Sequence, residues 1–131
     1  QAAEQAAFER GRATFELACA QCHQPSGRGE PGKAPPLRDS PWVLGDPERL
    51  GGIVLHGLVG EITFGSRTWD LEMPAFPADD VMLADLLTYL RREWGHDAEP
   101  VTPALMAKVR AETAERDEPF RVEDIADGHG R

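Results

Sequence analysis

The feature that most constrains this chain is a five-residue stretch that holds both of its cysteines, Cys19-Ala20-Gln21-Cys22-His23. Such a stretch can serve as a dithiol redox motif, as half of a zinc site or as an attachment site for a cofactor. A dithiol motif is expected within a βαβ pattern, and the surrounding sequence shows no alternation of strands and helices. A zinc site needs two more ligands at finger-like spacing, whereas His56, His96 and His129 are scattered. The third interpretation is therefore favoured.

In that interpretation the two thiols add to the vinyl groups of a haem and the adjacent His23 binds its iron. The spacing brings the cysteines to neighbouring edges of one porphyrin and carries the histidine under its centre. A six-coordinate iron needs a second axial ligand, for which c-type haems use methionine. We predict Met73, because Pro74 disfavours helical backbone before it and presents Met73 from an extended loop. His56 is the alternative ligand.

The two other methionines are weaker candidates. Met82 falls in an amphipathic run, where a core position is expected, and Met106 falls in the polar C-terminal region. Buried haem propionates would also need polar donors. Candidates near the motif in sequence are Ser40, Trp42, Arg49, Arg67 and Trp69.

Asp46 and Asp79 as helix caps and Gly57 as a helix end, together with apolar periodicity, predict a mainly α chain. Gly11, in the middle of the first helix, predicts a close contact with another helix. A glycine- and proline-rich loop follows the histidine, and Gly65-Ser66 suits the turn of a small hairpin. The predicted elements are helices over residues 2–18, 47–56 and 80–94, a loop over 24–41 and a hairpin over 62–69.

The character of the sequence changes after Gly95, which predicts a domain over residues 1–95 and a helical tail over 96–131. Thr102-Pro103 starts a helix that runs to about Ala114. The stretch from Arg116 to Arg131 is charged and is expected to fray into Asp-Gly-His-Gly-Arg. We favour a tail that packs over the domain as a strap, the alternative being a docking arm or a junction to another domain.

Together, four features resemble the class I cytochromes c, over roughly Phe8 to Trp94. They are the haem motif after the first helix, Pro35-Pro36-Leu37, Met73-Pro74, and small and aromatic residues suited to crossing of the first and last core helices. The resemblance implies the class I cytochrome c fold with a small β-hairpin and a C-terminal helical extension. It implies one covalent low-spin haem c, Cys19 and Cys22 as thioether anchors, and a hydrogen bond from His23 to the Pro35 carbonyl. Expected cofactor contacts are therefore Cys19, Cys22, His23, Met73, Pro35, Trp42, Arg49 and Trp69, with His23 and Met73 on the metal.

A haem with both axial positions filled has no open site for substrate, so we expect an electron carrier and not an enzyme. The run from His56 through Trp69 to Met73, followed by a long C-terminal extension, is similar to bacterial cytochromes c that donate to oxidases or that are paired with quinoprotein dehydrogenases. The chain is alternatively the haem domain of a larger dehydrogenase or oxidase complex. A five-coordinate gas-binding cytochrome, in which Met73 does not bind iron, is a third interpretation. Haem is attached to such motifs outside the cytoplasm, so a periplasmic or other extracytoplasmic location is expected.

Charge narrows the choice of partners. The chain has a net charge of −9, and residues 61–100 hold nine acidic and three basic side chains. An acidic surface argues against nucleic acid, and its simplest role is solubility. Alternatively it steers a redox protein with a basic docking face toward the haem edge. We expect a monomer with no membrane span, processed or excised from a longer chain since it begins at Gln1 without a leader.

Overall fold

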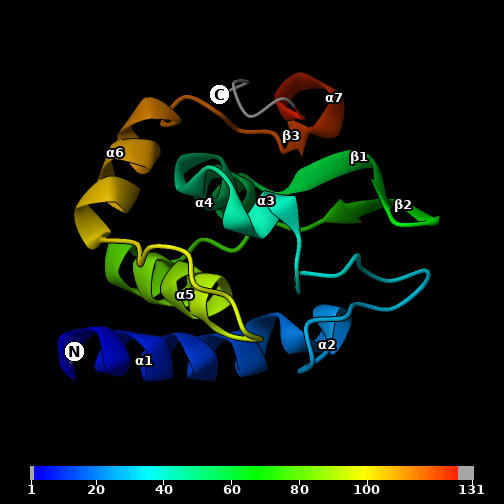
Figure 1. Cartoon of the computed structure of the whole chain (residues 1–131). Helices are drawn as coiled ribbons and strands as arrows, with labels where there is room; N and C mark the ends of the chain where they lie inside the picture. The colour runs from blue at the N-terminus through cyan, green and yellow to red at the C-terminus, as the bar shows by residue number, and fades with distance from the viewer. Residues whose placement is uncertain (1, 127–131) are drawn as a thin grey trace.

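In the computed structural model, which describes residues 2–126, helices predominate and a small three-stranded sheet flanks them (Figure 1). This confirms the mainly α class. Between these residues, no helix combines the length and the hydrophobicity that a membrane crossing requires. The elements are α1 (Ala2–Ala18), α2 (Ala20–His23), α3 (Pro41–Leu44), α4 (Pro47–His56), β1 (Leu58–Phe64), β2 (Arg67–Met73), α5 (Asp80–Arg92), α6 (Pro103–Glu112), β3 (Phe120–Arg121) and α7 (Val122–Ile125).

The first helix packs on α5, as the glycine at its centre predicts. A Cβ atom at Gly11 would lie 2.0 Å from the Asp85 carbonyl oxygen, so only glycine permits this approach. Phe8 and Phe15 place their rings 5.1 and 5.3 Å from the ring of Tyr89. This crossing anchors α1 on α5, and α1 leads directly into the cysteine motif.

The predicted signals at the ends of α4 are confirmed. The Asp46 carboxylate accepts a hydrogen bond from the Glu48 N–H at 2.8 Å, and Pro47 occupies the first turn. Gly57 ends the helix with a φ of 88°, a left-handed conformation that favours glycine. The short helix α3 uses the same chemistry, since the Ser40 hydroxyl accepts from the Trp42 N–H, and it was not predicted.

The hairpin is confirmed and extends beyond residues 62–69. β1 and β2 pair from Leu58 opposite Met73 to Phe64 opposite Arg67, closed by the predicted Gly65-Ser66 turn. Because side chains alternate along a strand, one face of the ribbon is almost wholly apolar. That face carries Leu58, Gly60, Ile62, Phe64, Trp69, Leu71 and Met73, all of which line the main cavity described below.

The C-terminal segment, residues 96–126, covers α4 and α5 from the other side (Figure 1). Met106 of α6 and Ile125 of α7 are 0% and 1% exposed, and Phe120 of β3 pairs in parallel with Leu58 of β1. The expected fraying is therefore wrong for residues 116–126, where apolar side chains at wide intervals are buried. The Asp-Gly-His-Gly-Arg end lies outside the described residues.

Candidate functional site

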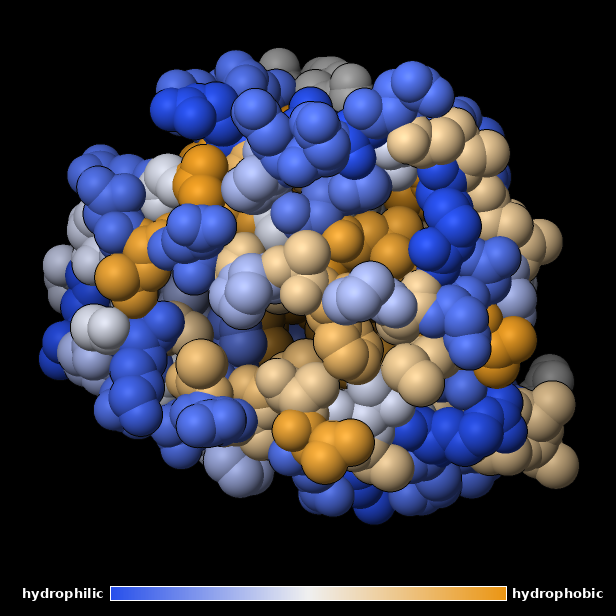
Figure 2. Space-filling view, turned by 180° about the vertical axis from the view of Figure 1, so that it is seen from behind, coloured by the Kyte–Doolittle hydropathy of each residue, from blue (hydrophilic) through white to orange (hydrophobic). Residues whose placement is uncertain are grey.

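A cavity of about 250 Å³ lies between α2, α4, α5 and the β1–β2 ribbon, and it is the main cavity among residues 2–126. Seen from behind, the molecule has a hollow with an apolar rim near the centre of this face (Figure 2). Apart from Glu72 and the residues discussed below, its walls are almost entirely hydrophobic. They include Ala34, Pro36, Leu37, Val43, Leu50, Ile53, Val54, Phe76, Leu86 and Leu90.

The cysteine motif forms one wall of this cavity. Cys19 is the N-terminal cap of the one-turn helix α2, and Cys22 and His23 follow within the same turn. Both cysteines are free thiols that line the cavity, Cys19 half-buried and Cys22 exposed. Burial raises the pKa of the Cys19 thiol to about 11, because a thiolate is poorly solvated there. The fold thus places two thiols and a histidine together on one wall.

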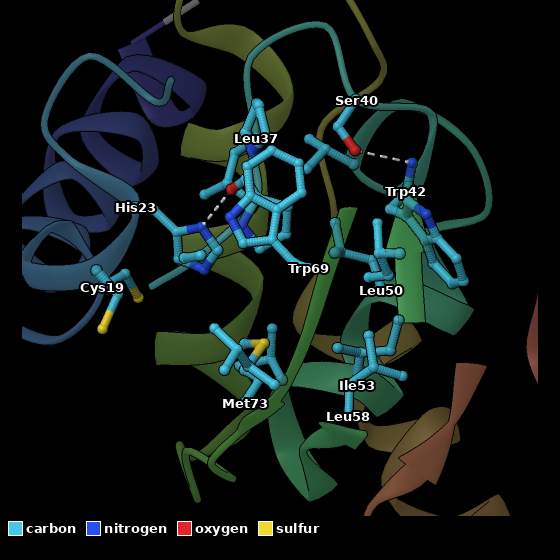
Figure 3. A pocket seen from close by; sticks show the side chains of 18 of the residues that line it. Cys19, His23, Leu37, Ser40, Trp42, Leu50, Ile53, Leu58, Trp69 and Met73 are labelled. Atoms are coloured by element: carbon cyan, nitrogen blue, oxygen red, sulfur yellow. Dashed lines mark hydrogen bonds between the residues drawn. The ribbon is translucent and has the colours of Figure 1, made fainter. Parts of the chain in front are cut away.

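The imidazole of His23 has a fixed tautomer. Its Nδ1 lies 3.0 Å from the Pro35 carbonyl oxygen, which can only accept a hydrogen bond, so Nδ1 carries the proton (Figure 3). Nε2, on the other side of the ring, therefore keeps its lone pair for a metal. Burial lowers the pKa of His23 and so favours the neutral ligand form, while the Pro35 hydrogen bond acts in the opposite direction. The hydrogen bond expected from the resemblance is present.

Met73 lies across the cavity from the motif (Figure 3). It is the last residue of β2 and not part of a loop, but its backbone is extended, and the chain leaves the strand at Pro74. Two contacts fix the position of the chain where it leaves β2. A Cβ atom at Gly57 would lie 2.6 Å from the Met73 carbonyl oxygen, and the Phe76 N–H donates to the Val54 carbonyl at 2.8 Å.

The alternative ligands are placed elsewhere. Met82 is 40% exposed, so the core position expected for it is wrong. Met106 belongs to α6 and is buried against Gly51 of α4. Neither lines the cavity. His56 also lies outside it, with Nε2 2.8 Å from the Thr113 hydroxyl.

The predicted polar donors divide into two groups. Ser40, Trp42 and Trp69 line the cavity, whereas Arg49 and Arg67 do not. The Trp69 Nε1–H donates to the Glu30 carbonyl at 3.0 Å, so it ties a loop to the ribbon. Arg49 is held behind the cavity wall: its guanidinium donates to the Ile125 carbonyl at 3.1 Å and lies 4.3 Å from the ring centre of Trp42.

Pro74 and Ala75 line the cavity just after the end of the ribbon, and they were not predicted as wall residues. The cationic Lys33 also lines the cavity and was not predicted there. Lys33 occupies the exposed part of the loop after the histidine, and nothing in its local sequence indicates a pocket. Only the folding of that loop over the cavity reveals it.

The donor set fits a haem better than a bare metal ion. Among residues 2–126, no cluster of three or more His, Cys, Asp or Glu side chains could hold a metal. Instead, one imidazole nitrogen and one thioether lie on opposite walls of an apolar cavity, with two thiols beside the imidazole. A haem requires this arrangement, because its central iron takes two axial ligands and its two vinyl groups react with thiols.

Comparisons with known proteins agree with the cavity. The family model described as "Cytochrome C oxidase, cbb3-type, subunit III" matches residues 6–90. Cytochrome c-552 of Thermus thermophilus is 33% identical over 104 residues, covering 71% of this chain and 79% of that relative. The cytochrome c subunit of the quinone alcohol dehydrogenase of Gluconobacter oxydans (strain 621H) is 34% identical over 83 residues, or 61% of this chain. The match spans 17% of that subunit.

The match to the family covers the helix crossing, the cysteine motif, the ribbon and Met73. Separately, most of the length of a relative that is itself a cytochrome c matches this chain. Haem-based electron transfer, and not enzymatic catalysis, is accordingly the function of this chain. It belongs to the class I monohaem c-type cytochromes, in the family described as cytochrome c oxidase, cbb3-type, subunit III.

Proposed function

We propose that this chain carries a single haem c through thioether bonds to Cys19 and Cys22, with His23 and Met73 as axial ligands of a low-spin iron. When bound, the haem supplies a one-electron couple between ferric and ferrous iron. The observation that carries the proposal is the His23–Pro35 hydrogen bond, since it leaves Nε2 as a ligand on the wall opposite Met73. The apolar walls exclude water, and the strand end at Met73 holds the thioether in a defined place.

Absorption spectra of the haem-loaded protein test this directly. We expect a weak sulfur-to-iron charge-transfer band in the ferric protein and no change on adding carbon monoxide to the ferrous protein. Both follow from a filled sixth position. Rapid binding of carbon monoxide would instead support the five-coordinate, gas-binding alternative and would contradict the ligand pair.

A second candidate is that the chain is the haem domain of a larger dehydrogenase complex. The likeness to the cytochrome c subunit of a quinone alcohol dehydrogenase supports it, because that relative is much longer than the match. The electron-transfer chemistry at the haem is the same in both cases. We propose a location outside the cytoplasm for either one, since covalent haem is attached to such cysteines there.

We further propose that the outer face of the ribbon guides a basic redox partner. Glu61 and Asp70 lie directly opposite each other on β1 and β2, with Glu72 two positions along. Like charges in that arrangement repel and lower stability. Within residues 2–126, no Lys, Arg or His forms an ion pair with any of these three carboxylates. All three side chains are exposed, and Glu72 also lines the cavity, so their field acts on the solvent beside it.

Neutralising this face is expected to weaken the salt dependence of electron transfer. With a cationic cobalt(III) complex as oxidant, the wild-type rate should fall several-fold between about 10 and 200 mM salt. The triple variant Glu61→Gln, Asp70→Asn, Glu72→Gln should fall less. The matched control Glu115→Gln, Asp117→Asn, Glu118→Gln changes the net charge equally on the C-terminal segment and should resemble the wild type. Equal slopes in the two triple variants would contradict local steering.

A further inference from the structure

The loop that carries Pro35, here called the histidine loop (residues 24–39), is held by a turn far away in sequence. This turn follows α5 and is called the α5 exit turn (residues 93–96). Its two ring side chains, Trp94 and His96, contact opposite ends of the histidine loop. Neither side chain lines the cavity, so the cavity does not explain why they are placed there.

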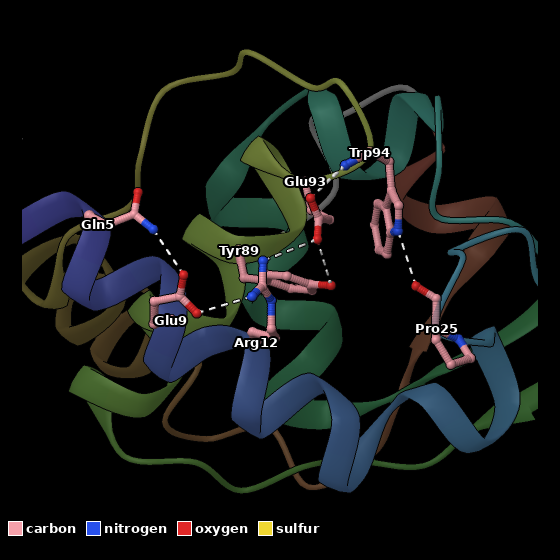
Figure 4. Close-up of polar contacts among 7 residues, drawn as sticks. All are labelled: Gln5, Glu9, Arg12, Pro25, Tyr89, Glu93 and Trp94. Atoms are coloured by element: carbon pink, nitrogen blue, oxygen red, sulfur yellow. Dashed lines mark hydrogen bonds and ion pairs between the residues drawn. The ribbon is translucent and has the colours of Figure 1, made fainter.

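Trp94 holds the beginning of the histidine loop. Its Nε1–H donates to the Pro25 carbonyl at 3.1 Å (Figure 4). Its indole also lies directly against Gly27, where a Cβ atom would approach the ring to 2.6 Å. The Gly27 carbonyl in turn accepts hydrogen bonds from the N–H groups of Leu37 and Arg38, so this contact reaches both arms of the loop.

His96 holds the end of the loop. Its Nδ1 lies 2.8 Å from the Leu90 carbonyl oxygen, which can only accept, so Nδ1 donates there. Its Nε2 accepts a hydrogen bond from the Asp39 N–H at 2.9 Å. The side chain is buried, and both ring nitrogens are used. It therefore links the end of α5 to the last residue of the histidine loop.

Backbone strain lies at the same three places. Among the non-glycine residues between 2 and 126, positive φ angles occur at Gln24, Asp39 and Trp94, with values of 69°, 61° and 58°. Such a conformation is strained for a residue with a side chain and persists only where the surroundings impose it. Here it marks both ends of the histidine loop and the turn that holds them.

We propose that Trp94 and His96 are positioning residues for the axial histidine. By fixing both ends of the histidine loop, they keep the Pro35 carbonyl within hydrogen-bond distance of His23 Nδ1–H. Gly29 completes the arrangement, since a Cβ atom there would lie 2.8 Å from the Pro35 oxygen. The inference rests on the proposed role of His23 as an iron ligand. It assigns to the end of α5 a part in setting the basicity of that ligand.

The test compares Trp94→Phe, which keeps an aromatic ring but loses the Nε1–H, with His96→Ala and its conservative counterpart His96→Gln. The control is His56→Ala, which removes a histidine bonded to Thr113 outside the loop. In the ferrous, haem-loaded protein, NMR gives the exchange rate of the His23 Nδ1 proton relative to the core amide of Leu87. The reduction potential is measured on the same samples.

We expect Trp94→Phe and His96→Ala each to speed exchange of the His23 Nδ1 proton about fivefold to tenfold, the effect of losing roughly one hydrogen bond. The reduction potential should rise, because a weaker hydrogen bond makes the ligand less basic and favours ferrous iron. His96→Gln should restore part of both effects, and His56→Ala should change neither.

If both variants lower stability while the Nδ1 exchange rate and the potential stay at wild-type values, Trp94 and His96 are only structural and the proposal is wrong. That outcome is distinct from failure of the ligand assignment. In the latter case the wild type itself would lack the spectrum of a histidine–methionine haem.

Discussion

Replacing Met73 with alanine is expected to open the sixth coordination position of the iron. Alanine offers no sulfur, and among the methionines only Met73 lines the cavity. The sulfur-to-iron band should disappear, and the ferrous protein should bind carbon monoxide. The reduction potential should fall on the order of 0.1 V, part of the roughly 0.8 V range over which axial ligands set haem potentials. Spectra with and without carbon monoxide and a redox titration measure all three.

The control for this variant is Met82→Ala, the same change at a side chain that is 40% exposed and outside the cavity. It should keep the wild-type spectrum and potential. A Met73→Ala protein that retains the sulfur band would show that another group binds the iron. His56 would then be examined first, although its position beside Thr113 predicts no such role.

Removing the C-terminal segment is expected to cost most of the stability of the fold. A chain that ends at Thr102 loses α6, β3 and α7 and with them five buried apolar side chains, Met106, Val109, Phe120, Val122 and Ile125. Full burial of such a side chain contributes about 1.5–3 kcal/mol. Five of them together rival the 5–15 kcal/mol that separates a typical domain from its unfolded state. Denaturant unfolding of the haem-loaded protein, followed by circular dichroism, measures the loss.

Because the shortened chain can fail to fold, Met106→Ala gives a graded version of the same test. Met106 is 0% exposed, and its truncation should lower the free energy of unfolding by about 2–5 kcal/mol. Met82→Ala is again the matched control and should cost well under 1 kcal/mol. Near-equal stabilities of these two variants, or a shortened chain as stable as the wild type, would mean that the segment is a separate arm. We propose that it is instead an integral layer of the domain.

Local chemistry explains which elements could be predicted from the sequence. Asp46, Asp79 and Thr102 each cap the helix that their position predicts, and Gly65-Ser66 closes the hairpin. These signals are strong because each depends on residues that are neighbours in the chain. The cysteine motif is of the same kind, since its two thiols and its imidazole share one turn of helix.

The features that were missed depend on partners that are distant in sequence. Phe120 lies in a charged stretch, and only its pairing with Leu58 shows it to be core. Met82 is exposed where a core position was expected, because helical periodicity gives a face and not the neighbour that covers it. Arg49 shows the same limit, because its hydrogen bond to the Ile125 carbonyl joins residues that lie far apart in the sequence.

Helix α4 has two unlike faces, and this has an electrical consequence. Leu50, Ile53 and Val54 line the cavity, while a Cβ atom at Gly51 or Gly52 would lie 2.8 Å from Met106 or 3.1 Å from Phe120. The smooth glycine face lets the C-terminal segment seal the helix against water. On this side a haem held in the cavity would be backed by helix α4 and by the buried apolar side chains of the C-terminal segment. Such a medium would disfavour the extra positive charge of ferric iron, so the segment would help to set the driving force for every electron that the protein accepts or releases.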